Sequence, residues 1–134
     1  MPHFDKHFTL NEANALLPRY REIFARIQEL IDEARGESSN VINLHGAGRT
    51  NGSTNGTHSA RDKALKIINE LISEITDAGV VIQDVSRGLI DFPAMVDGNE
   101  IFLCYELADG EAIQFYHELE SGYAGRRLII GDEF

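Results

Sequence analysis

The sequence predicts an α+β fold, in which an antiparallel helical hairpin packs on a small, mainly antiparallel sheet of three to four strands. Three observations predict it. Apolar residues recur at helical spacing in two segments of the first 78 residues, and a segment rich in Gly, Ser, Asn and Thr separates the two. From residue 80 onward the apolar spacing changes to the two-residue period of strands. A chain of 134 residues can bury one hydrophobic core, so we expect residues 1–134 to form a single domain.

Helix one is expected over residues 9–35. Thr9 and Glu12 have the spacing of a capping box, in which both side chains bind backbone N–H groups at the start of a helix. The apolar positions that follow alternate in steps of four and three, as in a core-facing helix: 13, 17, 20, 24, 27, 31 and 34. Pro18 removes one backbone hydrogen bond from the helix interior, so we expect a kink near this residue.

Residues 36–58 are rich in Gly, Ser, Asn and Thr and contain few apolar groups, which predicts a flexible loop. Helix two is expected over residues 59–78, where apolar residues again alternate in steps of four and three, and Gly79 is placed to end it. Because a flexible loop joins two helices of similar length, the helices are expected to pair as an antiparallel hairpin.

The sheet is expected within residues 80–120, followed by a C-terminal segment at 121–134. The expected strands are 80–85, 89–94, 101–107 and 113–119. Asp109-Gly110 is a strong hairpin signal between the last two strands. If the hairpin is centred there, Cys104 faces Phe115 and Phe102 faces His117.

Composition excludes several classes of protein. The net charge of −10 and the pI near 4.8 argue against a nucleic-acid binder, which normally presents a basic stripe. The sequence has no apolar run of the ~20 residues that a membrane-spanning helix needs, and its start lacks the apolar core of a signal peptide. Cys104 is the one cysteine, which rules out an internal disulfide and favours a reducing, cytoplasmic location.

Polar groups within the strand patterns of residues 84–127 are the candidate functional residues. His117 alternates with apolar neighbours on its strand, and an imidazole can act near neutral pH as a metal ligand or a general base. Asp84 and Asp91 are both placed to face inward. A histidine with two carboxylates suits a divalent cation, so Asp84, Asp91 and His117 are the expected metal ligands, although their spacing matches no known motif. The competing interpretation is a core histidine bound to backbone or carboxylate.

Two further side chains complete the candidate set. Gly122 and Gly125 allow a tight turn that could present Arg126 to an anionic ligand such as a carboxylate or phosphate. The competing interpretation is that Arg126 pairs internally with a nearby acid. Cys104 has no His or Lys next to it in sequence that would lower its pKa, so we interpret it as a packed core residue.

Two functions fit this pattern. We favour a non-catalytic, self-associating module that binds a partner protein, a second copy or a small anionic ligand. Both faces of the expected hairpin are apolar, one to be covered by the helices and one by a second subunit, so we expect a homodimer. The alternative is a metal-dependent, hydrolase-like enzyme. In it, Asp84, Asp91 and His117 would hold a divalent cation or share acid–base work, and Arg126 would bind an anionic substrate.

Three motifs stand out in combination: FTLNEANALLP near the start, GVVIQDVSRGLIDFPA in the centre, and LCYEL followed by AIQFYHELESGYAGR. With them the sequence resembles a bacterial and archaeal domain of unknown function, family 2203, over nearly the whole chain except residues 36–58. The resemblance implies a short cytosolic protein with no established activity. The family pattern favours Trp where this chain has Tyr105 and Tyr116, and a basic residue where it has Glu106.

Overall fold

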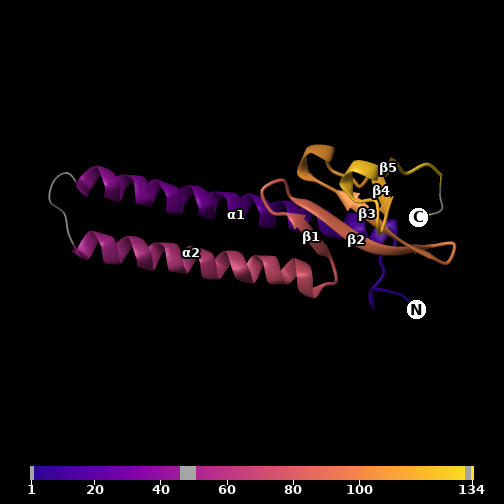
Figure 1. Cartoon of the computed structure of the whole chain (residues 1–134), viewed down its shortest axis with the longest axis horizontal. Coiled ribbons are helices and arrows are strands. Elements are labelled where there is room, and N and C mark those ends of the chain that lie inside the picture. The colour runs from indigo at the N-terminus through magenta and orange to yellow at the C-terminus, as the bar shows by residue number, and fades with distance from the viewer. Residues whose placement is uncertain (1, 46–50, 132–133) are drawn as a thin grey trace. The chain divides into compact units, whose positions relative to one another are not determined.

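The structure is a computed structural model that describes residues 2–45, 51–131 and 134 (Figure 1). The chain divides into two compact units. The sheet unit comprises Met1–Phe24 and Glu74–Phe134, and the helical unit comprises Ala25–Ser73. Within the described residues, the elements are two α-helices and a five-stranded sheet, with two short 3₁₀ turns. The predicted α+β class is confirmed.

The two helices are longer than the sequence pattern suggested. Helix α1 spans Leu10–His45 and helix α2 spans Asn51–Asp77. The prediction of a loop over 36–58 is therefore wrong for residues 36–45 and 51–58, which are helical. Residues 46–50 lie outside the described residues. Gly, Ser, Asn and Thr cost a helix at most about 1 kcal/mol each relative to Ala, and no proline interrupts the segment. Extending an existing helix needs no new nucleus, so α1 and α2 continue into residues whose composition alone suggests a loop.

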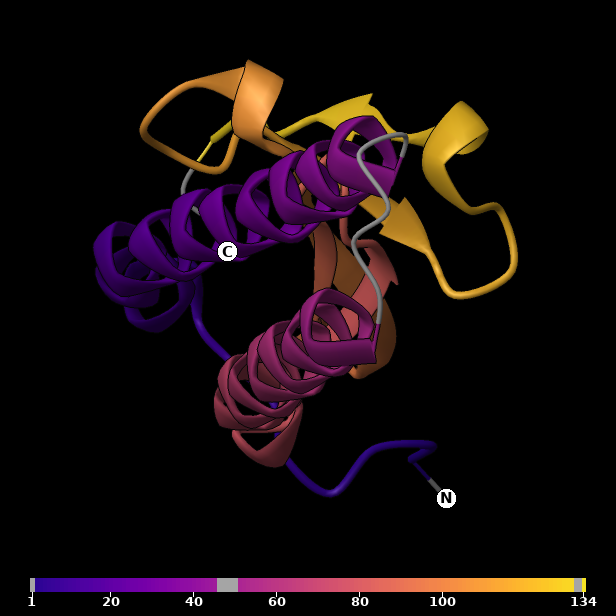
Figure 2. The ribbon, with the colours of Figure 1, turned by 90° about the vertical axis from the view of Figure 1, so that its left-hand side faces the viewer.

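The start of α1 and the end of α2 both carry the capping signals that the sequence predicts. The capping box at α1 is confirmed, because the Thr9 N–H donates to Glu12 Oε1 (2.8 Å) and the Glu12 N–H donates to Thr9 Oγ1 (3.1 Å). Helix α1 continues through Pro18. Gly79 adopts a φ of +100° directly after α2, a conformation that favours glycine and ends the helix. Within the helical unit α1 and α2 run antiparallel (Figure 1), and Figure 2 views them from the ends that flank residues 46–50.

The sheet is an antiparallel meander in the order β1-β2-β3-β4-β5. Its strands are β1 (Val81–Asp84), β2 (Leu89–Val96), β3 (Asn99–Tyr105), β4 (Phe115–Glu118) and β5 (Arg127–Leu128). It thus has one strand more than expected. Strand β5 lies in the C-terminal segment at 121–134, where no strand was predicted, and two residues are too few to produce a detectable alternation.

The register of β3 against β4 is the predicted one, with Phe102 opposite His117 and Cys104 opposite Phe115. The connection is longer than a two-residue turn, because it contains the 3₁₀ turn η1 (Leu107–Asp109). It remains centred on the predicted point, so the pairing is unchanged. A tight turn does occur between β2 and β3, where Asp97 and Gly98 have φ of +51° and +82° and Val96 pairs with Asn99.

The chain covers both faces of its own sheet. On one face, Phe92 contacts Phe8 and Tyr20, with ring centroids 5.4 and 6.2 Å apart, which packs the start of α1 on the sheet. On the other face, Phe4 packs edge-on against Phe102 at 5.3 Å. We expected the helices to cover one face and a second subunit to cover the other. The homodimer itself stays a prediction.

Among the described residues, neither helix is long and apolar enough to cross a membrane.

Candidate metal centre

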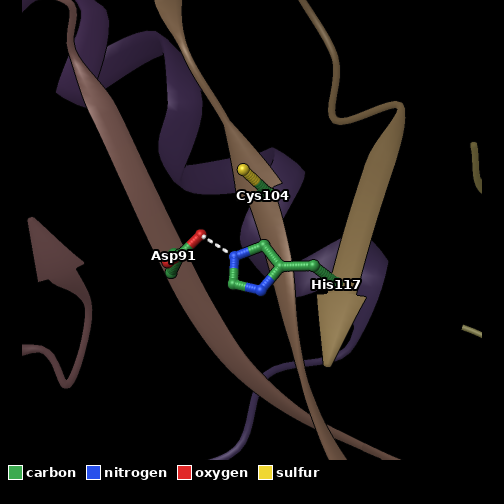
Figure 3. A group of neighbouring side chains, drawn as sticks. All are labelled: Asp91, Cys104 and His117. Atoms are coloured by element: carbon green, nitrogen blue, oxygen red, sulfur yellow. Dashed lines mark hydrogen bonds and ion pairs between the residues drawn. The ribbon is translucent and has the colours of Figure 1, made fainter. Parts of the chain in front are cut away.

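Three neighbouring strands bring Asp91, Cys104 and His117 together on one face of the sheet (Figure 3). Asp91 in β2 lies directly opposite Cys104 in β3. His117 in β4 lies opposite Phe102, two residues before Cys104 and therefore on the same face. A carboxylate oxygen of Asp91, the Cys104 Sγ and a ring nitrogen of His117 all lie within 4.8 Å of one another.

All three side chains are shielded from water. The exposed fractions are 1% for Asp91, 0% for Cys104 and 2% for His117. Burying a charge or a polar group costs free energy unless it finds a partner, so each of these groups must be satisfied inside the protein.

The partners of His117 fix the direction of its lone pair. Its Nδ1 lies 2.7 Å from the backbone carbonyl of Glu118. A carbonyl only accepts, so Nδ1 carries a hydrogen, and Nε2 faces Asp91 Oδ1 at 3.1 Å. An imidazole lone pair and a carboxylate oxygen are both acceptors, so a proton or a metal ion must lie between Nε2 and Oδ1. The other carboxylate oxygen of Asp91 accepts a hydrogen bond from Gln83 Nε2 at 3.1 Å.

Cys104 is a protonated thiol at neutral pH when no cation is bound. Burial raises the pKa of its thiol to about 12, the nearby charge of Asp91 adds to the rise, and Arg126 opposes it. Arg126 Nη1 lies 4.0 Å from the sulfur. A metal ion at Sγ would favour the thiolate directly, because only the thiolate is a strong ligand.

Arg126 is paired internally. Its guanidinium donates to both carboxylate oxygens of Asp109, at 2.7 and 2.9 Å, and lies 3.3 Å from Glu106. It also stacks over the rings of Phe115 and Tyr123, at 4.0 and 4.4 Å. Burial lowers the pKa of the guanidinium, but the bond to Asp109 outweighs it and the pKa is raised. This geometry matches the interpretation in which Arg126 pairs internally with a nearby acid. Arg126 also lies next to the cluster, because its Nη1 approaches the Cys104 sulfur.

Asp84 does not join the cluster. Its Oδ1 accepts hydrogen bonds from Ser86 Oγ (2.7 Å) and the Arg87 N–H (3.2 Å), which caps the turn between β1 and β2. These bonds, from Ser86 first and then Arg87, lower the pKa of Asp84. The structure therefore does not bring Asp84 together with Asp91 and His117. The pairing register shifts between Ile82 and Asp84, so the alternation that placed Asp84 inward breaks at that point.

Cys104, and not Asp84, is the third residue that the structure brings together with Asp91 and His117. The predicted hairpin register already placed Cys104 on the face of His117, but no nearby basic residue in the sequence marked it as a ligand. The missing information was the register of β2 against β3, which sets Asp91 opposite Cys104.

The donor set fits a divalent transition metal ion. Thiolate, imidazole and carboxylate are all zinc ligands, and a tetrahedral site with bonds of about 2.0–2.3 Å places ligand atoms roughly 3.3–3.6 Å apart. The separation of 3.1 Å between Nε2 and Oδ1 is close to that spacing, and all three ligand atoms lie within 4.8 Å of one another. Side-chain shifts on the order of 1 Å would bring the three ligand atoms to the spacing that a tetrahedral ion requires.

A cleft of about 620 Å³ opens elsewhere on the sheet unit, and none of the three cluster residues lines it. Its lining includes Glu100, Tyr116 and Glu118. This cleft therefore gives no route from solvent to Asp91, Cys104 or His117.

Comparison with curated proteins and with solved structures finds no match. One family model, described as an uncharacterized conserved protein (DUF2203), matches residues 6–129, which include both helices, all five strands and the three cluster residues. The chain therefore belongs to the DUF2203 family of uncharacterized conserved proteins.

Proposed function

We propose that this protein is a metal-binding module that holds one divalent transition metal ion, with zinc as the first candidate, through Asp91, Cys104 and His117. One observation carries the proposal. His117 donates Nδ1–H to the Glu118 carbonyl and so directs its Nε2 lone pair at Asp91 and Cys104. Histidines that bind metals in proteins are usually oriented in this way, by a carbonyl or carboxylate on the other ring nitrogen.

The charge of the site supports the proposal. A thiolate and a carboxylate carry two negative charges, the imidazole is neutral, and a divalent cation makes the buried centre neutral overall. The ion would also replace the proton that must otherwise lie between His117 and Asp91. Gln83, which donates to the second oxygen of Asp91, holds the carboxylate in position, as supporting residues around metal sites do.

Burial favours a non-catalytic role over the hydrolase alternative. A catalytic metal keeps a coordination position that substrate can reach, and three protein ligands leave one position of a tetrahedral ion free. It is therefore the burial of the site that favours a structural or sensing role. The exposed fractions of 0–2% at the three ligands leave a substrate no approach in the arrangement that the structure shows. Arg126, which the hydrolase hypothesis used to bind an anionic substrate, is already engaged by Asp109 and Glu106.

The test is metal analysis of untagged protein purified without chelators, followed by titration of the metal-free protein with Co²⁺. We expect about one equivalent of metal per chain, as a single site requires, and a thiolate-to-cobalt charge-transfer absorption. Cys104→Ser should abolish the absorption. His117→Gln should lower metal affinity by more than about tenfold, since the loss even of a residue that only supports a ligand costs about 10–100-fold.

Asp84→Asn is the matched control, because Asp84 is a carboxylate of the same sheet that lies outside the cluster. This variant should bind Co²⁺ like the wild type. The proposal is wrong if the wild-type protein takes up no Zn²⁺, Co²⁺ or Fe²⁺. It is equally wrong if Cys104→Ser and His117→Gln bind these ions as well as Asp84→Asn does.

A further inference from the structure

An irregular segment at the start of the chain lies over the face of the sheet that carries the cluster. We call residues 3–8 the N-terminal strap; they belong to no helix or strand. The Phe4 ring packs edge-on against Phe102, with centroids 5.3 Å apart. Phe102 in turn packs against the ring of His117, also at 5.3 Å. One aromatic ring therefore separates the strap from a proposed metal ligand.

A single carboxylate holds the outer half of the strap. Glu100 accepts hydrogen bonds from the His3 N–H (2.6 Å), the Phe4 N–H (3.0 Å) and His7 Nε2 (2.8 Å), with His3 Nδ1 at 3.2 Å. Its side chain is only 8% exposed. Among the described residues, every hydrogen-bond partner of this carboxylate comes from the strap. Glu100 therefore fastens the strap to the sheet, and we call this set of hydrogen bonds the Glu100 clip.

The inner end of the strap is fixed more firmly. The Phe8 N–H donates to the Pro93 carbonyl at 2.7 Å, and the Phe8 ring is buried against Phe92 on the helix side of the sheet. The capping box of α1 begins at the next residue, Thr9. If the Glu100 clip opens, residues 3–7 can lift away while Phe8 and α1 stay in place. Segments with few backbone bonds open locally at a lower free energy than the core.

We propose that the N-terminal strap gates access to the Asp91–Cys104–His117 cluster and that Glu100 holds this gate closed. Access to the metal centre rests on the function proposed above, whereas access to the Cys104 thiol does not. A gate changes the rates at which a ligand arrives and leaves. It changes affinity only as far as the closed strap stabilises the bound state.

The test uses Glu100→Ala and Phe4→Ala, which remove the clip and the covering ring, in the full chain. Glu120→Ala is the matched control, because Glu120 is an exposed carboxylate on the same cleft as Glu100 and has no bond to the strap. The first readout is the rate at which a maleimide labels Cys104, the one cysteine of the chain, in metal-free protein. The second is the stopped-flow rate of Co²⁺ uptake and of its release to a chelator.

We expect labelling at least about tenfold faster in Glu100→Ala, since hydrogen bonds to a charged group are among the stronger ones that a segment can lose. Phe4→Ala should also label faster, and Glu120→Ala should match the wild type. Cobalt uptake and release should accelerate together in the first two variants, with an unchanged final absorption spectrum.

The outcomes separate the two proposals. Unchanged labelling and unchanged cobalt rates in Glu100→Ala would overturn the gate even if the metal binds. So would labelling that only follows the free energy of global unfolding, measured for each variant in urea. Faster labelling in a protein that binds no metal would support the gate over Cys104 and overturn the metal-binding function.

Discussion

Replacing His117 with alanine in the metal-free protein should destabilise the fold strongly, because the change leaves a buried carboxylate without its main partner. Asp91 is 1% exposed and accepts hydrogen bonds from His117 and Gln83. In the variant, Gln83 and the Cys104 thiol remain its hydrogen-bond partners among the described residues. The change also removes the ring that packs against Phe102 and the hydrogen bond to the Glu118 carbonyl.

The expected loss is about 3–5 kcal/mol of unfolding free energy, which is the usual result of removing one partner of a buried ionic pair. This is a large share of the roughly 5–15 kcal/mol that holds an ordinary domain together. Asp91→Ala should also destabilise the protein. The double variant should cost less than the sum of the two, by about 1–3 kcal/mol, because the second change removes the group that the first left unpaired.

Urea unfolding followed by far-UV circular dichroism measures these free energies for the wild type, both single variants and the double variant. Zn²⁺ at 100 times its dissociation constant should add about 2.7 kcal/mol to the wild type alone, since it binds only the folded state. A loss below about 1 kcal/mol in metal-free His117→Ala would refute the reasoning, because changes at unimportant positions fall in that range. Strict additivity in the double variant would refute the direct pairing.

Three further outcomes follow from the geometry. Metal affinity should rise by up to roughly tenfold per pH unit near neutrality, because binding displaces the proton of the Cys104 thiol. Titrations with Co²⁺ at several pH values measure this rise. The bonds to Glu100, from the His3 N–H first and then from His7 and Phe4, lower its pKa to about 2 from 4.5. Strap docking should therefore be complete above about pH 4.5 and be lost as the pH falls toward 2, which the ring signals of Phe4 in NMR spectra report. Gly88→Ala should lower the melting temperature more than Gly98→Ala. Both glycines have positive φ, but only the new methyl group at 88 would meet Leu107, at 2.5 Å. Equal losses in melting temperature would contradict this steric account.

The helical part of the fold was predictable as far as periodicity reached. The capping box at Thr9 and the four-three spacing located both helices, and the glycine at 79 located the end of α2. The end of α1 and the start of α2 were not predictable, because residues 36–45 and 51–58 have a loop-like composition. Composition reports how much apolar surface a segment can bury, whereas helix extension depends on a propensity cost that is small for each residue.

The candidate site was predictable in part, for reasons that lie in strand pairing. His117 and Asp91 interrupt apolar strands, and a polar residue at an inward position requires a partner. Asp84 showed the same pattern and proved to be a turn cap, because a register shift at the end of β1 breaks the alternation there. Period-two patterns assign a face only while the strand stays regular, so strand ends are where such assignments fail.

Cys104 could have been identified as the third member from a turn that the sequence displays plainly. Asp97-Gly98 is a hairpin dipeptide, and a two-residue turn there sets Val96 opposite Asn99. Counting back along both strands from that turn sets Asp91 opposite Cys104, as observed. The predicted register of the next hairpin already placed Cys104 beside His117. Two hairpin registers in succession therefore determine which polar side chains of three strands meet. The spacing of those residues along the chain, at 91, 104 and 117, matches no local motif.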